Sequence, residues 1–119
     1  MSDILTESDL AGFTGSEHVF KHRMTQVLYT KGVQYVAEKG GAYWLLDKIV
    51  ILSKWEKAIR RESFQVWTLK VGDKSKATLI CDDGNGNEVY REVIEWTDFP
   101  LKEIKFYLTS NVLMLPREF

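Results

Sequence analysis

The 119-residue sequence lacks several features that would assign a class of protein at once. It has one cysteine, Cys81, so an intrachain disulfide cannot form and the disulfide-stabilised secreted scaffolds are excluded. Its two prolines, Pro100 and Pro116, lie near the C-terminus, so no proline-rich linker divides the chain. We therefore expect a single domain over residues 1–119, with 1–15 as a loosely ordered lead-in, in the reducing cytoplasm.

Long apolar runs and an excess of one charge are also missing. The most apolar segment, Ala42 to Leu52, is shorter than the roughly 20 residues that a membrane helix needs, and Asp47 and Lys48 interrupt it. The N-terminus has no basic stretch followed by an apolar one, so we expect no signal peptide. Lysine and arginine total 16 against 17 aspartate and glutamate, so the basic excess of dedicated nucleic-acid-binding domains is absent.

What remains is a globular composition, with helical signals in the first half of the chain. Thr30 can cap a short amphipathic helix that the pair Gly40-Gly41 ends. The next segment, Ala42 to Leu52, is apolar on most sides, which predicts a mostly buried central helix. We expect a helical continuation, straight or bent, through Lys54 to Arg61, because no glycine or proline intervenes.

From Phe64 onward, β-branched and aromatic residues and turn dipeptides dominate. The pattern predicts three antiparallel strands in a meander, over Phe64 to Val71, Ala77 to Cys81 and Glu88 to Trp96. Turns at Gly72-Asp73-Lys74 and at Asp83 to Asn87 contain residues that tolerate positive φ, and these turns join the three strands.

The C-terminal segment Leu101 to Thr109 fits either a strand or a helix. The capping residues favour the helix, because Asp98 can act as its N-cap and Asn111 can take the left-handed conformation at its end. Val112 to Leu115 would then be a short strand, while Glu17 to His22 is either an edge strand or an irregular lead-in. The fold class predicted is α+β: N-terminal helices packed on an antiparallel β-meander of three to five strands, with a short C-terminal helix or hairpin.

Several blocks of sequence resemble one family, in order along the chain: FTGSE, YTKGVQYVAEKGGAYWLLDKI, FQVWTLKV, CDDGNG, and TDFPLKEI with its VLMLP ending. The family consists of small proteins of unknown function encoded by bacterial chromosomes, plasmids and phages, and the resemblance extends from Phe13 over nearly the whole chain. Its members often end in a Ser-Glu pair after the last proline, where this chain has Arg117-Glu118. The resemblance implies an accessory or regulatory protein and carries over no activity.

The sequence contains two groups of potential metal ligands, and for both of them a role without a metal is the better explanation. Asp82 to Glu88 is rich in oxygen donors, but Glu88 and Ile94 would stand where a calcium loop needs glycine and glutamate, so a hairpin turn is favoured. His18 and His22 have the spacing of a chelating pair, but the sequence places no third ligand, so we expect two exposed histidines. Calcium and zinc should therefore leave the unfolding temperature unchanged.

Cys81 is the remaining candidate for chemistry. It follows Leu79 and Ile80 and precedes two acidic residues, which would raise the pKa of a thiol rather than lower it. We therefore expect a buried structural cysteine that Ala or Val can replace, a protein that is not an enzyme, and no cofactor.

Fifteen aromatic residues exceed what one small core readily buries. Trp67, Tyr90 and Trp96 lie on the expected strands and form the candidate partner surface. The segment Phe64 to Val71 is apolar on both faces, which is typical of a strand covered on both sides. One cover is the central helix, and the second is either the C-terminal segment or another chain.

One basic cluster consists of Lys54, Lys57, Arg60 and Arg61. Basic side chains next to an aromatic residue can contact phosphates and stack on a base, although Trp55 is expected to pack inward with Ile59. The function predicted is that of a non-enzymatic intracellular interaction or accessory protein, which binds an unknown protein or a second copy of itself. The alternative is a weak nucleic-acid-binding module that uses this cluster.

Overall fold

The computed structural model describes residues 5–10 and 19–119. In chain order, the strands are β1 (Val19–Lys21), β2 (Leu28–Thr30), β3 (Phe64–Val71), β4 (Ala77–Asp82), β5 (Glu88–Ile94), β6 (Glu103–Thr109) and β7 (Val112–Met114). The helices are α1 (Glu7–Leu10), α2 (Lys31–Lys39), α3 (Tyr43–Trp55) and α4 (Lys57–Arg60), with 3-10 turns η1 (Asp73–Ser75) and η2 (Pro116–Glu118).

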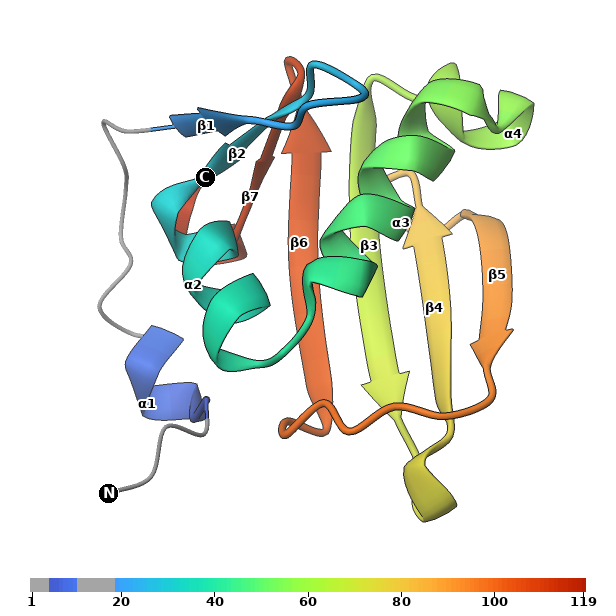
Figure 1. Ribbon diagram of the computed structural model, residues 1–119. Helices are drawn as coiled ribbons and strands as arrows, with labels where there is room; N and C mark the ends of the chain where they lie inside the picture. The colour runs from blue at the N-terminus through green and yellow to red at the C-terminus, as the bar shows by residue number, and fades with distance from the viewer. Residues whose placement is uncertain (1–4, 11–18) are drawn as a thin grey trace.

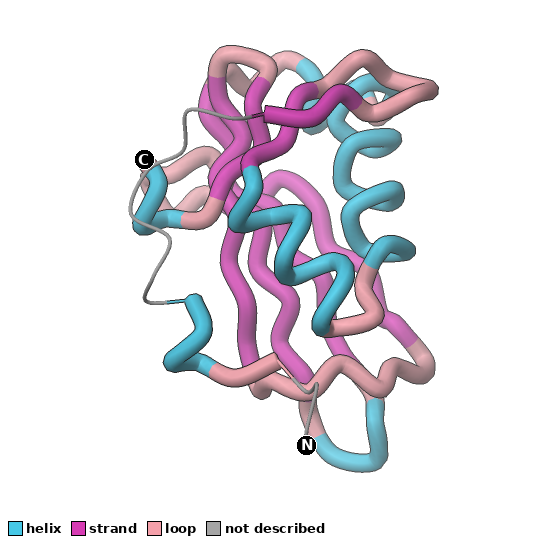
Figure 2. Tube along the Cα trace, turned by 60° about the vertical axis from the view of Figure 1, so that its left-hand side comes forward, coloured by secondary structure: helices cyan, strands magenta, loops and turns pink. Residues whose placement is uncertain are grey.

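The strands of residues 19–119 form one seven-stranded sheet in the order β1-β2-β7-β6-β3-β4-β5. Neighbouring strands are antiparallel except for β2 and β7, which are parallel. Helices α2 and α3 lie against one face of this sheet (Figures 1 and 2). The α+β class is confirmed, while the expected three to five strands were too few.

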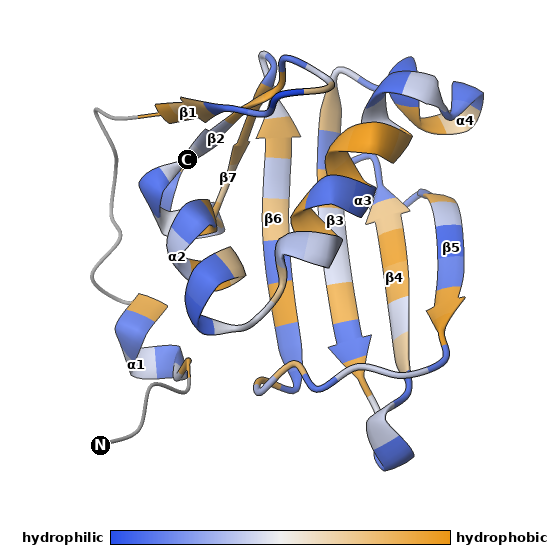
Figure 3. Cartoon of the chain, viewed as in Figure 1, coloured by the Kyte–Doolittle hydropathy of each residue, from blue (hydrophilic) through white to orange (hydrophobic). Residues whose placement is uncertain are grey.

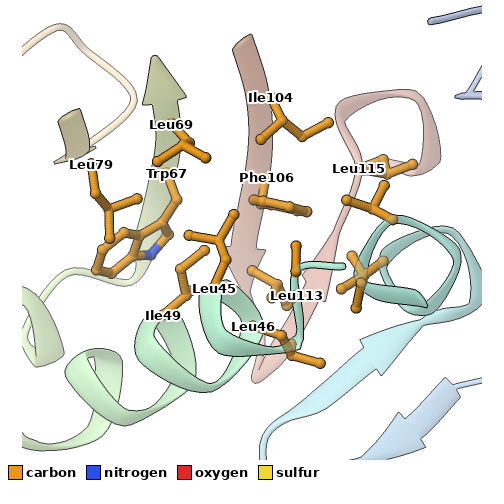
Figure 4. Close-up of a cluster of buried hydrophobic side chains, with 14 of the residues drawn as sticks. Leu45, Leu46, Ile49, Trp67, Leu69, Leu79, Ile104, Phe106, Leu113 and Leu115 are labelled. Carbon is orange, nitrogen blue, oxygen red and sulfur yellow. The ribbon is translucent and has the colours of Figure 1, made fainter. Parts of the chain in front are cut away.

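Helix α3 lies across the middle of the sheet and buries its apolar side, as its composition predicts. Leu45, Ile49 and Val50 have no solvent exposure, and much of the α3 ribbon is coloured as hydrophobic in Figure 3. Figure 4 shows Leu45 and Ile49 directed at Trp67 on the central strand β3. Burial of several such aliphatic side chains, each worth about 1.5–3 kcal/mol, makes this contact the main part of the core.

Both ends of helix α2 are formed as the sequence predicts. The Thr30 side chain accepts a hydrogen bond from the Val33 backbone N–H at 3.3 Å, and Gly41 takes a positive φ of 61° just beyond the far end. Glu118 adds a contact that the sequence did not reveal: its carboxylate accepts from the Thr30 hydroxyl at 2.6 Å and from the Gly32 N–H at 3.3 Å. A Cβ at position 32 would lie 2.6 Å from this carboxylate, so the contact with Glu118 requires glycine there.

The C-terminal segment is strand β6, which forms a hairpin with β7, so the hairpin alternative is confirmed and the helix that the capping residues favoured is wrong. The β6 side chains Ile104, Phe106 and Leu108 alternate into the core, and the strand pairs along the whole length of β3. Pairing with an open sheet edge outweighs local caps, since it satisfies a row of backbone groups and buries three side chains together. Asn111 does take the left-handed conformation, with φ of 64°, but in the hairpin turn before β7.

The segment Glu17 to His22 contains the edge strand β1, which confirms one of its two interpretations for the described residues. Strand β2, which the sequence did not predict, lies between β1 and β7. In the part of the chain that the structure describes, the helices are too short or too polar to cross a bilayer.

Ser110 should be a weak point of the fold. It has a φ of 51° in the two-residue turn between β6 and β7, a conformation that asparagine tolerates much better than serine. We expect Ser110→Asn to raise the free energy of unfolding by about 0.5–1 kcal/mol and Ser110→Val to lower it by at least about 1 kcal/mol. Urea denaturation of the three proteins measures both changes, and equal stability of all three would contradict the strain.

Candidate functional site

A pocket of about 510 Å³ opens where strand β3 begins and strand β6 ends. The end of α3, helix α4 and the β6–β7 turn meet there, at the top of Figure 1. Its volume is in the range of small-molecule sites. We call it the sheet-end pocket, and it is lined by Val27, Ser53, Lys54, Arg60, Glu62, Ser63, Phe64, Gln65, Leu108, Thr109, Ser110 and Asn111.

Gln65 makes one wall of the sheet-end pocket rigid. Its buried amide donates hydrogen bonds to the carbonyl oxygens of Ile59 at 3.2 Å and Glu62 at 3.3 Å. Its side-chain oxygen accepts from the indole N–H of Trp67 at 2.9 Å. One side chain therefore joins α4 and the segment after it to the core beneath α3.

The predicted basic cluster is divided by a break in the helix. Glu56 has extended backbone angles, with φ of -83° and ψ of 116°, so α3 ends at Trp55 and α4 starts in a new direction. Lys54 and Arg60 therefore line the sheet-end pocket, whereas Lys57 and Arg61 do not. The expected continuation of the helix is thus bent at Glu56.

The prediction that Trp55 packs inward with Ile59 is wrong. Trp55 is 58% exposed, while Ile59 is fully buried. The break at Glu56 explains the difference, because it rotates Ile59 into the core independently of the last turn of α3. An exposed indole thus stands next to Lys54 in sequence.

The partner surface expected from Trp67, Tyr90 and Trp96 is not one surface. Trp67 is completely buried, because its side of β3 faces α3, and its ring lies 6.3 Å from that of Tyr90. Tyr90 is partly buried, and its hydroxyl donates to Glu92 at 2.7 Å. Of the three, Trp96 is strongly exposed, at 66%.

The face of the sheet opposite α2 and α3 holds a different group of aromatic side chains. The rings of Phe64, Tyr107 and Phe119 form a triangle with centroid distances of 5.2–5.6 Å. We call these three residues the outer aromatic cluster. One sign of this cluster is visible in the sequence, because Phe64 and Val66 are apolar residues on the same face of their strand. Tyr107 was missed because its segment was interpreted as a helix.

His22 is not the exposed histidine that was expected. It is 8% exposed, and its Nδ1 accepts from the backbone N–H groups of Met24 and Thr25 at 3.3 Å each. Its Nε2 therefore carries the proton and donates to Asp47 at 2.9 Å. Its proposed metal partner His18 lies outside the described residues. Within residues 5–10 and 19–119, no three His, Cys, Asp or Glu side chains are grouped as metal ligands.

The segment Asp82 to Glu88 is the hairpin turn between β4 and β5, as predicted. The Asp83 carboxylate accepts from the Asn87 side chain at 2.9 Å and from the Asn85 N–H at 2.8 Å, and these bonds lower its pKa. Gly84 and Gly86 supply positive φ values of 88° and 86°. The oxygens of Asp83 thus organise the turn itself.

Cys81 lies on β4 between Trp67 and Tyr90 and is fully buried. Burial, together with the neighbouring charges of Asp82 and Glu62, raises the pKa of its thiol to about 12. The thiol is therefore protonated at neutral pH and is a core side chain.

The fold places this chain among small α+β proteins with a helical layer on one face of a mostly antiparallel sheet. The chain belongs to DUF6876, a family of unknown function whose family model matches residues 4–119. The family membership indicated by the sequence blocks is thereby confirmed. No curated protein and no solved structure matches the chain.

Loss of Gln65 should destabilise the protein. Gln65→Ala leaves the buried N–H of Trp67 without an acceptor and removes one hydrogen bond from each of the Ile59 and Glu62 carbonyls, so we expect the free energy of unfolding to fall by about 2–3 kcal/mol. Urea denaturation measures this change. Gln34→Ala on α2, where no described side-chain hydrogen bond is lost, is the control and should stay within about 0.5 kcal/mol. Similar losses in both variants would contradict the assigned role.

The thiol of Cys81 should make the protein less stable in alkali. Its pKa in the fold exceeds the ordinary value of 9.0, so its stabilising contribution is complete below pH 9 and is lost as pH rises towards about 12. We expect Cys81→Ala to flatten this decline, although Tyr90, whose pKa is also raised to about 12, retains its own part. Urea denaturation across this pH range tests the expectation. Rapid reaction of the native thiol with a modifying reagent at neutral pH would disprove it.

Proposed function

We propose that this protein is a non-catalytic interaction or accessory protein of a reducing compartment, and that the outer face of its sheet binds a second copy of the chain. The outer face is the one opposite α2 and α3, and no α-helix of the described residues covers it (Figure 2). The outer aromatic cluster on this face is the observation that carries the proposal. Apolar area of this kind on a protein surface marks an interface.

The apolar character extends beyond the three rings. Cross-strand pairing places the buried Val66 opposite Tyr107, and Tyr107 opposite the partly buried Met114, on the same side of the sheet. Phe119 is 72% exposed, so the most accessible ring of the outer aromatic cluster meets solvent. Aromatic residues and methionine are the types enriched in the cores of protein interfaces.

The charges around this apolar area favour a second copy over a strongly charged partner. Lys70 lies directly opposite Glu103, and Lys105 lies one position along on the same face. The chain as a whole carries a net charge of -1. When two copies with positive and negative side chains on this face pair about a two-fold axis, a lysine of one copy can lie near a glutamate of the other. Two faces that carried charges of one sign would repel each other.

A dimer through this face would need an interface of ordinary size. A standard interface buries about 800 Å² on each partner, roughly a ninth of the 7110 Å² surface of the described chain. The outer faces of the neighbouring strands β7, β6, β3 and β4 adjoin the outer aromatic cluster.

The absence of enzymatic activity is part of this proposal, and three features support it. Cys81 is buried with a raised thiol pKa, both ring nitrogens of His22 have hydrogen-bond partners, and the Asp83 oxygens are used within their own turn. None of the three is presented to a substrate as a nucleophile or base.

Sedimentation velocity over a range of micromolar concentrations tests the dimer. The wild type should show a concentration-dependent shift to the dimer, and Phe119→Ser should weaken association roughly tenfold or more, as loss of a central apolar contact does. Trp55→Ser, which removes another exposed aromatic residue at the end of α3, is the matched control and should associate like the wild type. A wild-type protein that stays monomeric throughout, or equal effects of the two variants, would refute the interface.

The second candidate function is weak nucleic-acid binding, which the exposure of Trp55 favours. An exposed indole beside Lys54 provides both a stacking surface and a phosphate contact. Retention on immobilised single-stranded DNA should then decrease steeply with salt, and Trp55→Ala should reduce it more than Trp96→Ala, a change in an equally exposed tryptophan. Equal retention of the two variants would argue against stacking at Trp55.

A further inference from the structure

We propose that the sheet-end pocket binds a small phosphomonoester, with Lys54 and Arg60 as the residues that hold the phosphate. This site adjoins the dimer interface proposed above, with Phe64 common to both, and the proposal does not depend on that interface. The proposal rests on the charges, the hydroxyl groups and the shape of the pocket.

The two cations of the pocket are available for a ligand. Neither Lys54 nor Arg60 forms an ion pair with a carboxylate in the described part of the chain. They come from the two sides of the helix break at Glu56, so the break brings both to one cavity. Two cations that share a pocket repel each other, and an anion between them removes that repulsion. Arginine and lysine together are the usual binders of phosphate.

Hydroxyl groups complete the set of hydrogen-bond donors. Ser63, Thr109 and Ser110 line the same pocket, and their hydroxyls make no side-chain hydrogen bond to the described residues. Ser110 lies in the two-residue turn between β6 and β7, and this turn brings it into the pocket lining.

The remaining lining indicates what is attached to the phosphate. The ring of Phe64 provides an apolar wall, and the Glu62 carboxylate is an acceptor for hydroxyl groups. A volume of about 510 Å³ has room for more than a phosphate group. A sugar phosphate or mononucleotide therefore fits the pocket better than inorganic phosphate, because it can use both the ring and the carboxylate.

A simpler role for the cations makes a different prediction. Lys54 lies in the last turn of α3 and Arg60 in that of α4, where a positive charge stabilises a helix. Lys57, the first residue of α4, lies outside the pocket. A purely helix-stabilising role would lower the unfolding temperature of Lys54→Gln and Arg60→Gln and would give no ligand binding.

Isothermal titration calorimetry with adenosine 5′-monophosphate, inorganic phosphate and adenosine tests the site. We expect the monophosphate to bind more tightly than inorganic phosphate, and adenosine not to bind measurably. Lys54→Gln and Arg60→Gln should each weaken binding of the monophosphate roughly tenfold, the effect of losing one charged hydrogen bond. Glu62→Gln should not weaken binding of inorganic phosphate, because it removes a negative charge beside it.

Lys57→Gln is the matched control, since it removes one positive charge of the same cluster from outside the pocket. Arg61 is not used, because its Nε lies 4.0 Å from the Glu62 carboxylate of the pocket. Lys57→Gln should bind the monophosphate within about twofold of the wild type. A loss in this control equal to those of Lys54→Gln and Arg60→Gln would mean diffuse attraction and would overturn the pocket. Failure of all the phosphate-bearing probes to bind would overturn it as well.

A pair of short single-stranded oligonucleotides, with and without a 5′-phosphate, separates the two sources of such a ligand. If the phosphorylated strand binds more tightly than the monophosphate and the unphosphorylated strand does not, the ligand is a nucleic-acid end. If the monophosphate binds at least as well as the phosphorylated strand, the ligand is a free small molecule. If both strands bind equally and the monophosphate does not bind, the proposal is wrong and the contact is with backbone phosphates.

Discussion

The hydrogen bond between Trp67 and Gln65 is the contact on which the arrangement of this protein depends. Trp67 is the largest fully buried side chain, and it lies on the central strand under α3. A buried indole N–H requires an acceptor, and the Gln65 oxygen is that acceptor at 2.9 Å. The same glutamine holds the carbonyls of Ile59 and Glu62, so the packing of the core fixes where α4 lies and thereby the wall of the sheet-end pocket.

The parts of the fold that could be predicted from the sequence are those encoded by neighbouring residues. The cap at Thr30 and the meander from Phe64 to Ile94 depend on local patterns, and both are confirmed. Strand β6 was not predicted, because the local capping residues Asp98 and Asn111 favoured a helix. Its pairing with the distant strand β3 decides the structure instead. The parallel pairing of β2 with β7 joins segments more than 80 residues apart, for which a single sequence contains no direct signal.

The candidate site, too, could be predicted from the sequence only in part. Lys54 and Arg60 were identified as a basic cluster by composition, but their separation from Lys57 and Arg61 follows from the break at Glu56, where neither glycine nor proline stands. Trp67 was assigned to the surface because both parities of its strand are apolar. Parity shows which residues share a face, but it does not show which face the helices cover.

Phe64 belongs both to the outer aromatic cluster and to the wall of the sheet-end pocket, so the two proposed sites share one ring. Coupling between two sites requires a shared element with two arrangements that the ligands favour differently. Phe64 has little freedom of this kind. A Cβ at Gly84 would lie 2.7 Å from its ring, so the ring packs directly against that turn, while Tyr107 packs at 5.2 Å on the strand beside it. Because these two contacts hold the ring without Phe119, we expect the pocket to keep its shape whether or not the outer face is occupied, and the two proposed sites to bind independently.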